Sequence, residues 1–134
     1  MQEQKQIELL RSEKIDLVIL ARYHQILTKQ FVESFPRQII NIHHSFLPAF
    51  AGSNPYLQAY QKGVKVIGAT SHYVTEGLDE GPIIAQSSFN IGPGMGLKEI
   101  MARGQRAEAA TLVKAVKLYL GKHLDVYWGV VREV

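Results

Sequence analysis

The sequence predicts an α/β fold, with a Rossmann-like, open and mostly parallel sheet and flanking helices. Residues 16–21 form a continuous apolar run of strand length, which is typical of a strand covered on both faces. A helical pattern over 29–35 follows, and then a second apolar strand over 38–42. A strand, a helix and a strand at this spacing form a βαβ unit, whose crossover we expect to be right-handed.

The other elements are expected on both sides of this unit. Residues 3–13 have the spacing of a short amphipathic helix, and Thr28 is the expected N-cap of helix 29–35, which Pro36 ends. Further along, we expect a helix over 54–62, two strands over 64–75 and 82–91 that pair as an antiparallel hairpin, a helix over 97–120, and one or two short edge strands over 124–134. Together they form a single domain over 1–134.

The helix over 97–120 is the longest helical pattern. Its apolar residues recur at helical spacing and predict the stripe that packs on the sheet. The stripe consists of Leu97, Ile100, Met101, Ala107, Ala110, Leu112, Val113, Val116 and Leu120.

The composition is that of an ordinary globular protein, with 46% hydrophobic and 20% charged residues and a formal net charge of +3. No apolar run approaches the ~18–20 residues of a membrane span, and the polar start does not resemble a secretory signal. We therefore expect a cytoplasmic protein. The basic residues are scattered, so we expect no nucleic-acid partner. Because no segment is long and apolar enough to span a membrane, we also expect no membrane partner. Cysteine is absent and the five histidines lack zinc-binding spacing, so we expect no metal site.

The candidate chemistry lies in residues 39–48. Asn41 and His43 are two residues apart in a predicted strand and so point to the same face, whereas His44 points the other way. An amide beside an imidazole offers a hydrogen-bond donor and a proton carrier at one spot, as reactions through an oxyanion require. The alternative is a strand end whose polar residues meet solvent. Polar residues follow both strands of the βαβ unit, and ligands bind at this edge of open sheets, which favours the functional interpretation.

Three further residues have two interpretations each. Asp79, in a turn-forming segment, either caps nearby N–H groups or is the acid/base partner of His43. His72 alternates along a predicted strand and is either a packed or a functional histidine. His24 follows a strand and either lines a pocket or faces water.

The glycine-rich segment 92–96 matches no phosphate-binding motif and is expected to be a flexible loop.

Three separated blocks resemble the formyltetrahydrofolate deformylases, within the wider formyltransferase family. The blocks are NIHHSFLPAF at 41–50, NPYLQAYQKGVKVIGATSHYVT at 54–75 and LDEGPII at 78–84. The His-His-Ser sequence and the Pro-Tyr pair at 55–56 favour the deformylases over the glycinamide ribonucleotide formyltransferases. The resemblance implies the C-terminal part of a formyltransferase-type fold.

By this resemblance, Asn41, His43 and Asp79 would be the catalytic residues. The implied reaction hydrolyses 10-formyltetrahydrofolate to tetrahydrofolate and formate, with the folate as substrate and no cofactor. Asn41 and a charged His43 would stabilise the oxyanion, each donor contributing ~3–4 kcal/mol if preorganised, while Asp79 takes the proton from water. The implied substrate-binding residues are Tyr23, His24, Gln25, Ile26, Leu27, His72, Thr75, Glu76 and Gly77.

The sequence also departs from the family's pattern. Pro93 stands where the deformylases usually have a histidine, Gly96 replaces a helix-capping Ser or Thr, and Leu57 stands where a histidine is common. The family's catalytic domain begins with further βα units, which an ACT-type domain precedes in the deformylases. We therefore expect a truncated product or a fragment.

Truncation would expose the edge of strand 16–21, so we expect a homo-oligomer. Two alternative functions stay open. The first is formyl transfer to an amine acceptor, and the second is a folate-binding or oligomerising module without turnover.

Overall fold

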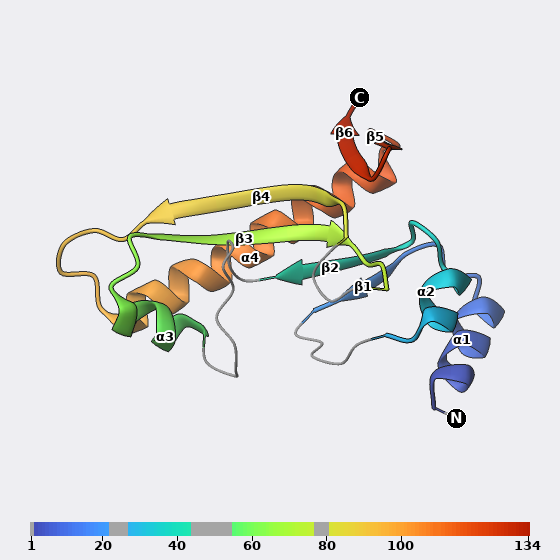
Figure 1. Ribbon diagram of the computed structural model, residues 1–134, viewed down its shortest axis with the longest axis horizontal. Helices are drawn as coiled ribbons and strands as arrows, with labels where there is room; N and C mark the ends of the chain where they lie inside the picture. Colours follow the sequence, from blue (N-terminus) through green and yellow to red (C-terminus); the bar gives the residue numbers. More distant parts are fainter. Residues whose placement is uncertain (1, 22–26, 44–54, 77–80) are drawn as a thin grey trace.

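The computed structural model of the protein describes residues 2–21, 27–43, 55–76 and 81–134. Its centre is a four-stranded sheet in the order β1-β2-β3-β4, shown in Figure 1. The strands are β1 (Val18–Leu20), β2 (Ile39–His43), β3 (Val66–Tyr73) and β4 (Ile83–Asn90). The helices are α1 (Gln2–Ser12), α2 (Lys29–Ser34), α3 (Pro55–Lys62) and α4 (Leu97–Leu120), and a hairpin of β5 (Leu124–Tyr127) and β6 (Val130–Glu133) follows α4.

The expected α/β class with flanking helices is confirmed, but the sheet is mixed rather than mostly parallel. β1 and β2 are parallel, as the βαβ unit predicted, whereas β3 is antiparallel to both β2 and β4. The β3–β4 pair is the predicted hairpin. The β2–β3 pair is antiparallel, and Figure 1 shows α3 beyond the sheet end at which β2 stops and β3 begins.

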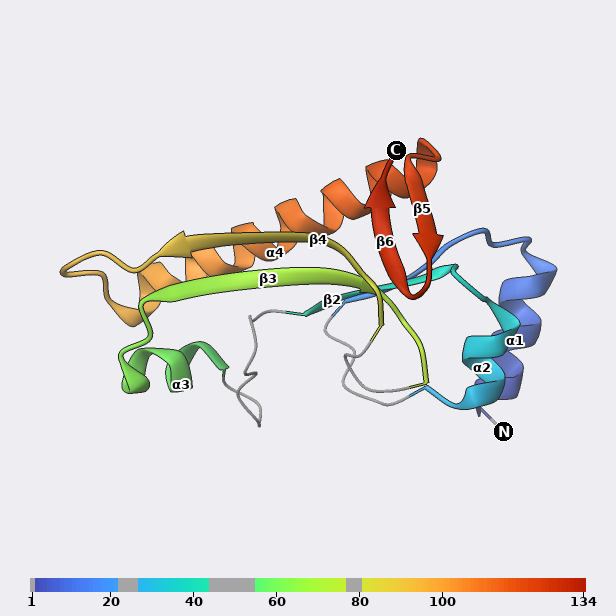
Figure 2. The same ribbon diagram turned by 45° about the horizontal axis from the view of Figure 1, so that its top comes forward.

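The two faces of the sheet pack against different helices. Ile39 belongs to a buried cluster with Ile7 of α1 and Phe31 of α2. Its neighbour Ile40 is fully buried in a second cluster that contains Ala115 of α4. Figure 2 shows α4 running along one side of the sheet. Because side chains alternate along a strand, β2 presents one residue to each core in turn.

α4 has the predicted bounds, but its buried stripe differs from the predicted one. The buried residues are Ile100, Gly104, Thr111 and Ala115. Val113 and Leu120 are 51% and 66% exposed, contrary to the prediction. At 100° per residue these two positions lie away from the helix side that faces the sheet. Gly104 in this stripe leaves room for the ring of Tyr56 on α3, which a Cβ at position 104 would overlap. A count of apolar residues alone misses such a position.

The last two strands were expected at the edge of the sheet. They instead form a separate two-stranded sheet. Val126 and Val131 of this hairpin pack against the buried cluster that contains Ile40 and Ala115. The hairpin therefore covers one end of the core between the sheet and α4. Tyr127 and Trp128 at its turn are exposed, with their rings edge to face at a centroid distance of 5.7 Å.

α2 begins as the sequence predicted. The Thr28 hydroxyl accepts a hydrogen bond from the backbone N–H of Phe31 at 3.3 Å. The same hydroxyl donates to Glu3 Oε1 at 3.1 Å, and the Thr28 backbone N–H reaches that oxygen at 3.2 Å. Thr28 therefore caps α2 and also connects it to α1. Both helices pack on the sheet face that contains Ile39.

We expect Thr28→Ala to lower the free energy of unfolding by about 1 kcal/mol, because the cap and the contact with Glu3 are lost together. Urea unfolding measures this change. Thr28→Ser is the control, since serine retains the hydroxyl and should stay within a few tenths of a kcal/mol of the parent chain. Equal stability of the alanine and serine variants would contradict the role of the cap.

Candidate active site

Asn41 and His43 lie together on the sheet face opposite α4. Ile39 on the same side of β2 packs against α1 and α2, and alternation places Asn41 and His43 on that side too. The predicted pairing of these two side chains on one face is therefore confirmed. Both residues are partly buried. Across β3, Asn41 is opposite His72 and His43 is opposite Thr70.

His72 is packed directly beside Asn41. Its side chain is 4% exposed, and its Nδ1 lies 2.9 Å from the carbonyl oxygen of Tyr73. A carbonyl can only accept, so Nδ1 carries the proton in this contact. In the neutral ring Nε2 then accepts, and the Nδ2 of Asn41 lies 3.5 Å from it. The two interpretations of His72 are thus compatible, because a buried histidine orients the amide of Asn41.

Gly81, two residues after Asp79 in the sequence, lies against β3. It is buried, and the backbone N–H of Tyr73 donates to the carbonyl of the next residue, Pro82, at 2.9 Å. A Cβ at position 81 would overlap the carbonyl of Tyr73 and lie 3.2 Å from His72 Nδ1. Gly81 therefore packs against the same Tyr73 carbonyl that accepts from His72. Only glycine permits this approach.

Thr70 and Gln86 extend the site beyond the residues that the sequence singled out. Thr70 is 8% exposed and lies opposite Gln86 of β4. The Gln86 Nε2 donates to Thr70 Oγ1 at 3.0 Å. His43, Thr70 and Gln86 thus form one row across three strands. The alternation of Thr70 with His72 was visible in the sequence, but the register that aligns the row was not.

Several predicted site residues lie outside the part of the chain that the structure describes. These residues are Tyr23, His24, Gln25, Ile26, Gly77 and Asp79. Of the others, Leu27 is 7% exposed and belongs to the core cluster with Phe31. Thr75 and Glu76 are exposed and directly follow β3.

The tyrosines with shifted pKa values lie on the opposite face. Burial raises the pKa of Tyr73, the nearby Tyr119 raises it further, and Arg37 lowers it. Burial also raises the pKa of Tyr119, with a further contribution from Asp16. The two rings are edge to face at 6.4 Å, and both belong to the cluster beneath α4. They are structural groups rather than acid/base groups of the site.

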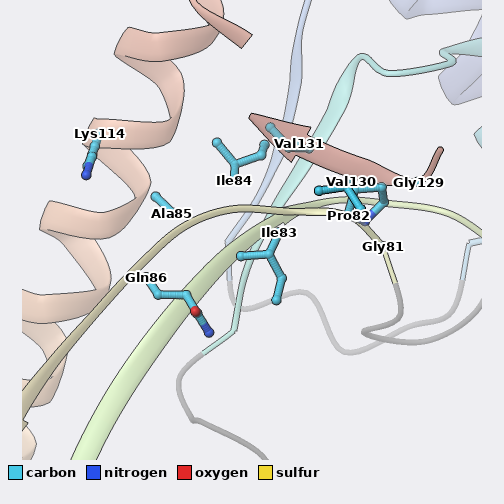
Figure 3. Close-up of a pocket in the computed structure, with 10 residues that line it drawn as sticks. All are labelled: Gly81, Pro82, Ile83, Ile84, Ala85, Gln86, Lys114, Gly129, Val130 and Val131. Atoms are coloured by element: carbon cyan, nitrogen blue, oxygen red, sulfur yellow. The ribbon is translucent and has the colours of Figure 1, made fainter. Parts of the chain in front are cut away.

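A surface hollow of about 540 Å³ lies at the outer side of β4, next to the β5–β6 hairpin. Figure 3 shows its lining, from Gly81 to Gln86 along the chain, with Lys114 and the segment 129–131. Asn41, His43 and His72 do not line it. The hollow therefore does not contain the candidate catalytic residues. Gln86 lines it and also belongs to the row with His43 and Thr70.

Two further observations concern the part of the chain that the structure describes. No helix there is long and apolar enough to cross a membrane. Within the same residues, no group of three or more histidine or acidic side chains is arranged to hold a metal ion.

Comparison with known proteins places this geometry in a family. Residues 1–116 match the Formyl transferase family. The chain belongs to this family. Formyltetrahydrofolate deformylase of Bacillus subtilis (strain 168) is 51% identical over 125 residues, which is 93% of this chain and 42% of the relative. The deformylase of Escherichia coli (strain K12) is 46% identical over 125 residues, with 93% and 45% covered.

Solved formyl transferase structures have the same fold. The formyltetrahydrofolate deformylase of Pseudomonas putida KT2440 superposes with a TM-score of 0.90 at 39% identity, covering 99% of this chain and 48% of that one. Phosphoribosylglycinamide formyltransferase from Anaplasma phagocytophilum gives 0.88 at 37% identity, with 98% and 65% covered. The chain spans less than half the length of these deformylases.

We expect Gly81→Ala to lower the free energy of unfolding by about 1–3 kcal/mol, the usual range for overpacking, because the new methyl group meets the Tyr73 carbonyl. The same change should broaden or shift the ring NMR signals of His72. Gly92→Ala is the matched control, since a Cβ there meets nothing within 4 Å. A Gly81→Ala protein as stable as the Gly92→Ala protein would contradict this close packing.

Proposed function

We propose that the chain hydrolyses 10-formyltetrahydrofolate to tetrahydrofolate and formate. The observation that carries this proposal is the Asn41–His43 pair on one face of β2, in a chain 51% identical to a protein named formyltetrahydrofolate deformylase. The formate released would supply one-carbon units, for example to purine synthesis. The hydrogen bonding of His72 to Asn41 supports a fixed amide donor at this position.

The proposed mechanism assigns one task to each residue. The oxygen of water attacks the formyl carbon while Asp79 takes a proton from that water. The carbonyl oxygen becomes an oxyanion, which the amide N–H of Asn41 and the charged imidazole of His43 stabilise. The C–N bond then breaks as His43 gives its proton to the leaving folate nitrogen. The formic acid released loses its proton to solvent and departs as formate, and the proton on Asp79 passes to His43, which restores both groups.

The Asn41 amide is suited to this task because its direction is set before substrate binds. One of its N–H bonds points toward His72 Nε2, and His72 is itself held by the Tyr73 carbonyl. The second N–H bond then has a fixed direction in the plane of the amide. Donors that need no reorientation stabilise an oxyanion most, since the cost of ordering them was met on folding.

We expect Asp79→Asn to leave the fold intact and to remove most of the formate release. The amide is nearly the same size but takes no proton at neutral pH, and the loss of one acid/base group typically costs 10²–10⁴-fold in rate. Formate release from 10-formyltetrahydrofolate measures it, and circular dichroism controls for folding. Near-normal turnover by the Asp79→Asn protein would contradict the assignment.

A second candidate is formyl transfer to an amine acceptor. The structural likeness to phosphoribosylglycinamide formyltransferase, with a TM-score of 0.88, favours considering it. The same assay separates the two reactions, because a transferase consumes the formyl donor only when glycinamide ribonucleotide is present. A third candidate, a folate-binding module without turnover, would bind the folate and leave the formyl group in place.

We also propose that the chain forms a homo-oligomer through the free side of β1. β1 has three residues and pairs with β2 alone among the described strands. Ile19 on this strand is 43% exposed and Ile15 just before it is 38% exposed. An apolar strand edge of this kind is a template for pairing with another chain. A second copy that covers it would bury both isoleucines.

Light scattering should therefore give a mass above that of one chain, and Ile19→Lys should shift it toward the monomer because a charge blocks the edge. Val113→Lys is the control, since Val113 is similarly exposed but lies on α4. A parent chain that stays monomeric at every accessible concentration would contradict the proposal.

A further inference from the structure

The row across the sheet ends at Gln86, a residue with no part in the mechanism above. Gln86 on β4 donates to Thr70 Oγ1 at 3.0 Å, and Thr70 is the cross-strand partner of His43. Directly opposed residues of an antiparallel pair have Cβ atoms about 4.5–5.5 Å apart and share one face. Thr70 therefore lies between Gln86 and His43 in this row.

The chemistry of the three groups fixes the direction of the hydrogen bonds. An amide nitrogen only donates, so the contact with Gln86 uses one lone pair of the Thr70 oxygen. The hydroxyl keeps one proton and a second lone pair. It is thus able to donate to a neutral imidazole and, after rotation about its C–O bond, to accept from a charged one. A carboxylate at position 70 could only accept a hydrogen bond from the imidazole, and a methyl group could neither donate nor accept one.

We propose that Gln86 is a positioning residue for His43 and acts through the hydroxyl of Thr70. This inference rests on the proposed function, in which His43 changes its protonation state in each turnover. Gln86 holds the Thr70 side chain in one rotamer. The hydroxyl then supports the His43 ring nitrogen that faces β3 in both states, which leaves the other ring nitrogen directed at the substrate.

The alternative is that Gln86 and Thr70 form an ordinary cross-strand polar pair that stabilises the hairpin. The two explanations differ in what happens when Gln86 becomes glutamate. A carboxylate only accepts, so the Thr70 proton must turn toward it. Thr70 then has only lone pairs for His43, and the imidazole must place its N–H toward β3. A purely structural pair would leave the His43 tautomer unchanged.

The experiment compares Gln86→Glu with Ser88→Glu. Ser88 lies two residues further along β4, opposite Gly68, and is exposed, so its variant adds the same charge on the same strand without touching Thr70. The ¹⁵N shifts of the His43 ring, assigned by their loss in His43→Gln, show which nitrogen carries the proton. We expect Gln86→Glu to exchange the two ring nitrogens of neutral His43, and Ser88→Glu to leave them as in the parent chain.

Turnover gives a second and independent measurement. Gln86→Glu should lower kcat by about tenfold, the scale of one misdirected hydrogen bond, and leave KM nearly unchanged. Thr70→Val should lower kcat similarly, and Thr70→Ser should restore it because serine keeps the hydroxyl.

The outcomes separate this inference from the proposed function. If the parent chain releases formate and Gln86→Glu leaves the His43 tautomer unchanged, the role of Gln86 is overturned and the deformylase proposal stands. If Gln86→Glu exchanges the ring nitrogens but the parent chain releases no formate, the hydrogen-bonded row stands and the proposed function fails. A parent chain with neither property overturns both.

Discussion

The alternation of β2 between two cores is the constraint on which the rest of the structure depends. Ile39 is buried against α1 and α2, and Ile40 is buried beneath α4. Since each isoleucine can satisfy only one core, the strand cannot slip by one residue without exposing both. The same pleat decides that Asn41 and His43 point away from α4. Hydrophobic packing in the first half of the strand thus sets the direction of the polar residues in its second half.

β3 adds further polar residues to the sheet face on which Asn41 and His43 lie. It pairs with β2 on one side and with β4 on the other, and Thr70, Ser71 and His72 have a paired residue on both strands. Thr70 and His72 are its buried polar residues on the face opposite α4. Buried polar groups need hydrogen-bond partners. His72 has the Tyr73 carbonyl and Asn41, and Thr70 has Gln86. Satisfying these groups also orients the side chains that the proposed chemistry requires.

The glycine at position 81 packs closely against this surface. The sequence motif Asp-Glu-Gly-Pro suggests turn chemistry alone. In the structure the glycine is needed because its backbone lies against the carbonyl of Tyr73, the same carbonyl that accepts from His72. Folding of the β3–β4 hairpin and orientation of the site are therefore coupled through one backbone group. Membership of the formyl transferase family agrees with this arrangement, and the shared fold extends over 99% of the chain.

The sequence by itself determined the local structure: the βαβ unit, the Thr28 cap, the bounds of α4, the hairpin, and the shared face of Asn41 and His43. These features depend on periodicity, capping and alternation, which act between near neighbours in the chain. Only the tertiary structure decided the mixed pairing of the sheet, the side of α4 that is buried, the separate β5–β6 sheet, and the row from His43 to Gln86. These features depend on strand register and on contacts between elements far apart in the sequence. The local pattern of apolar and polar residues does not specify which residues of two such elements face each other.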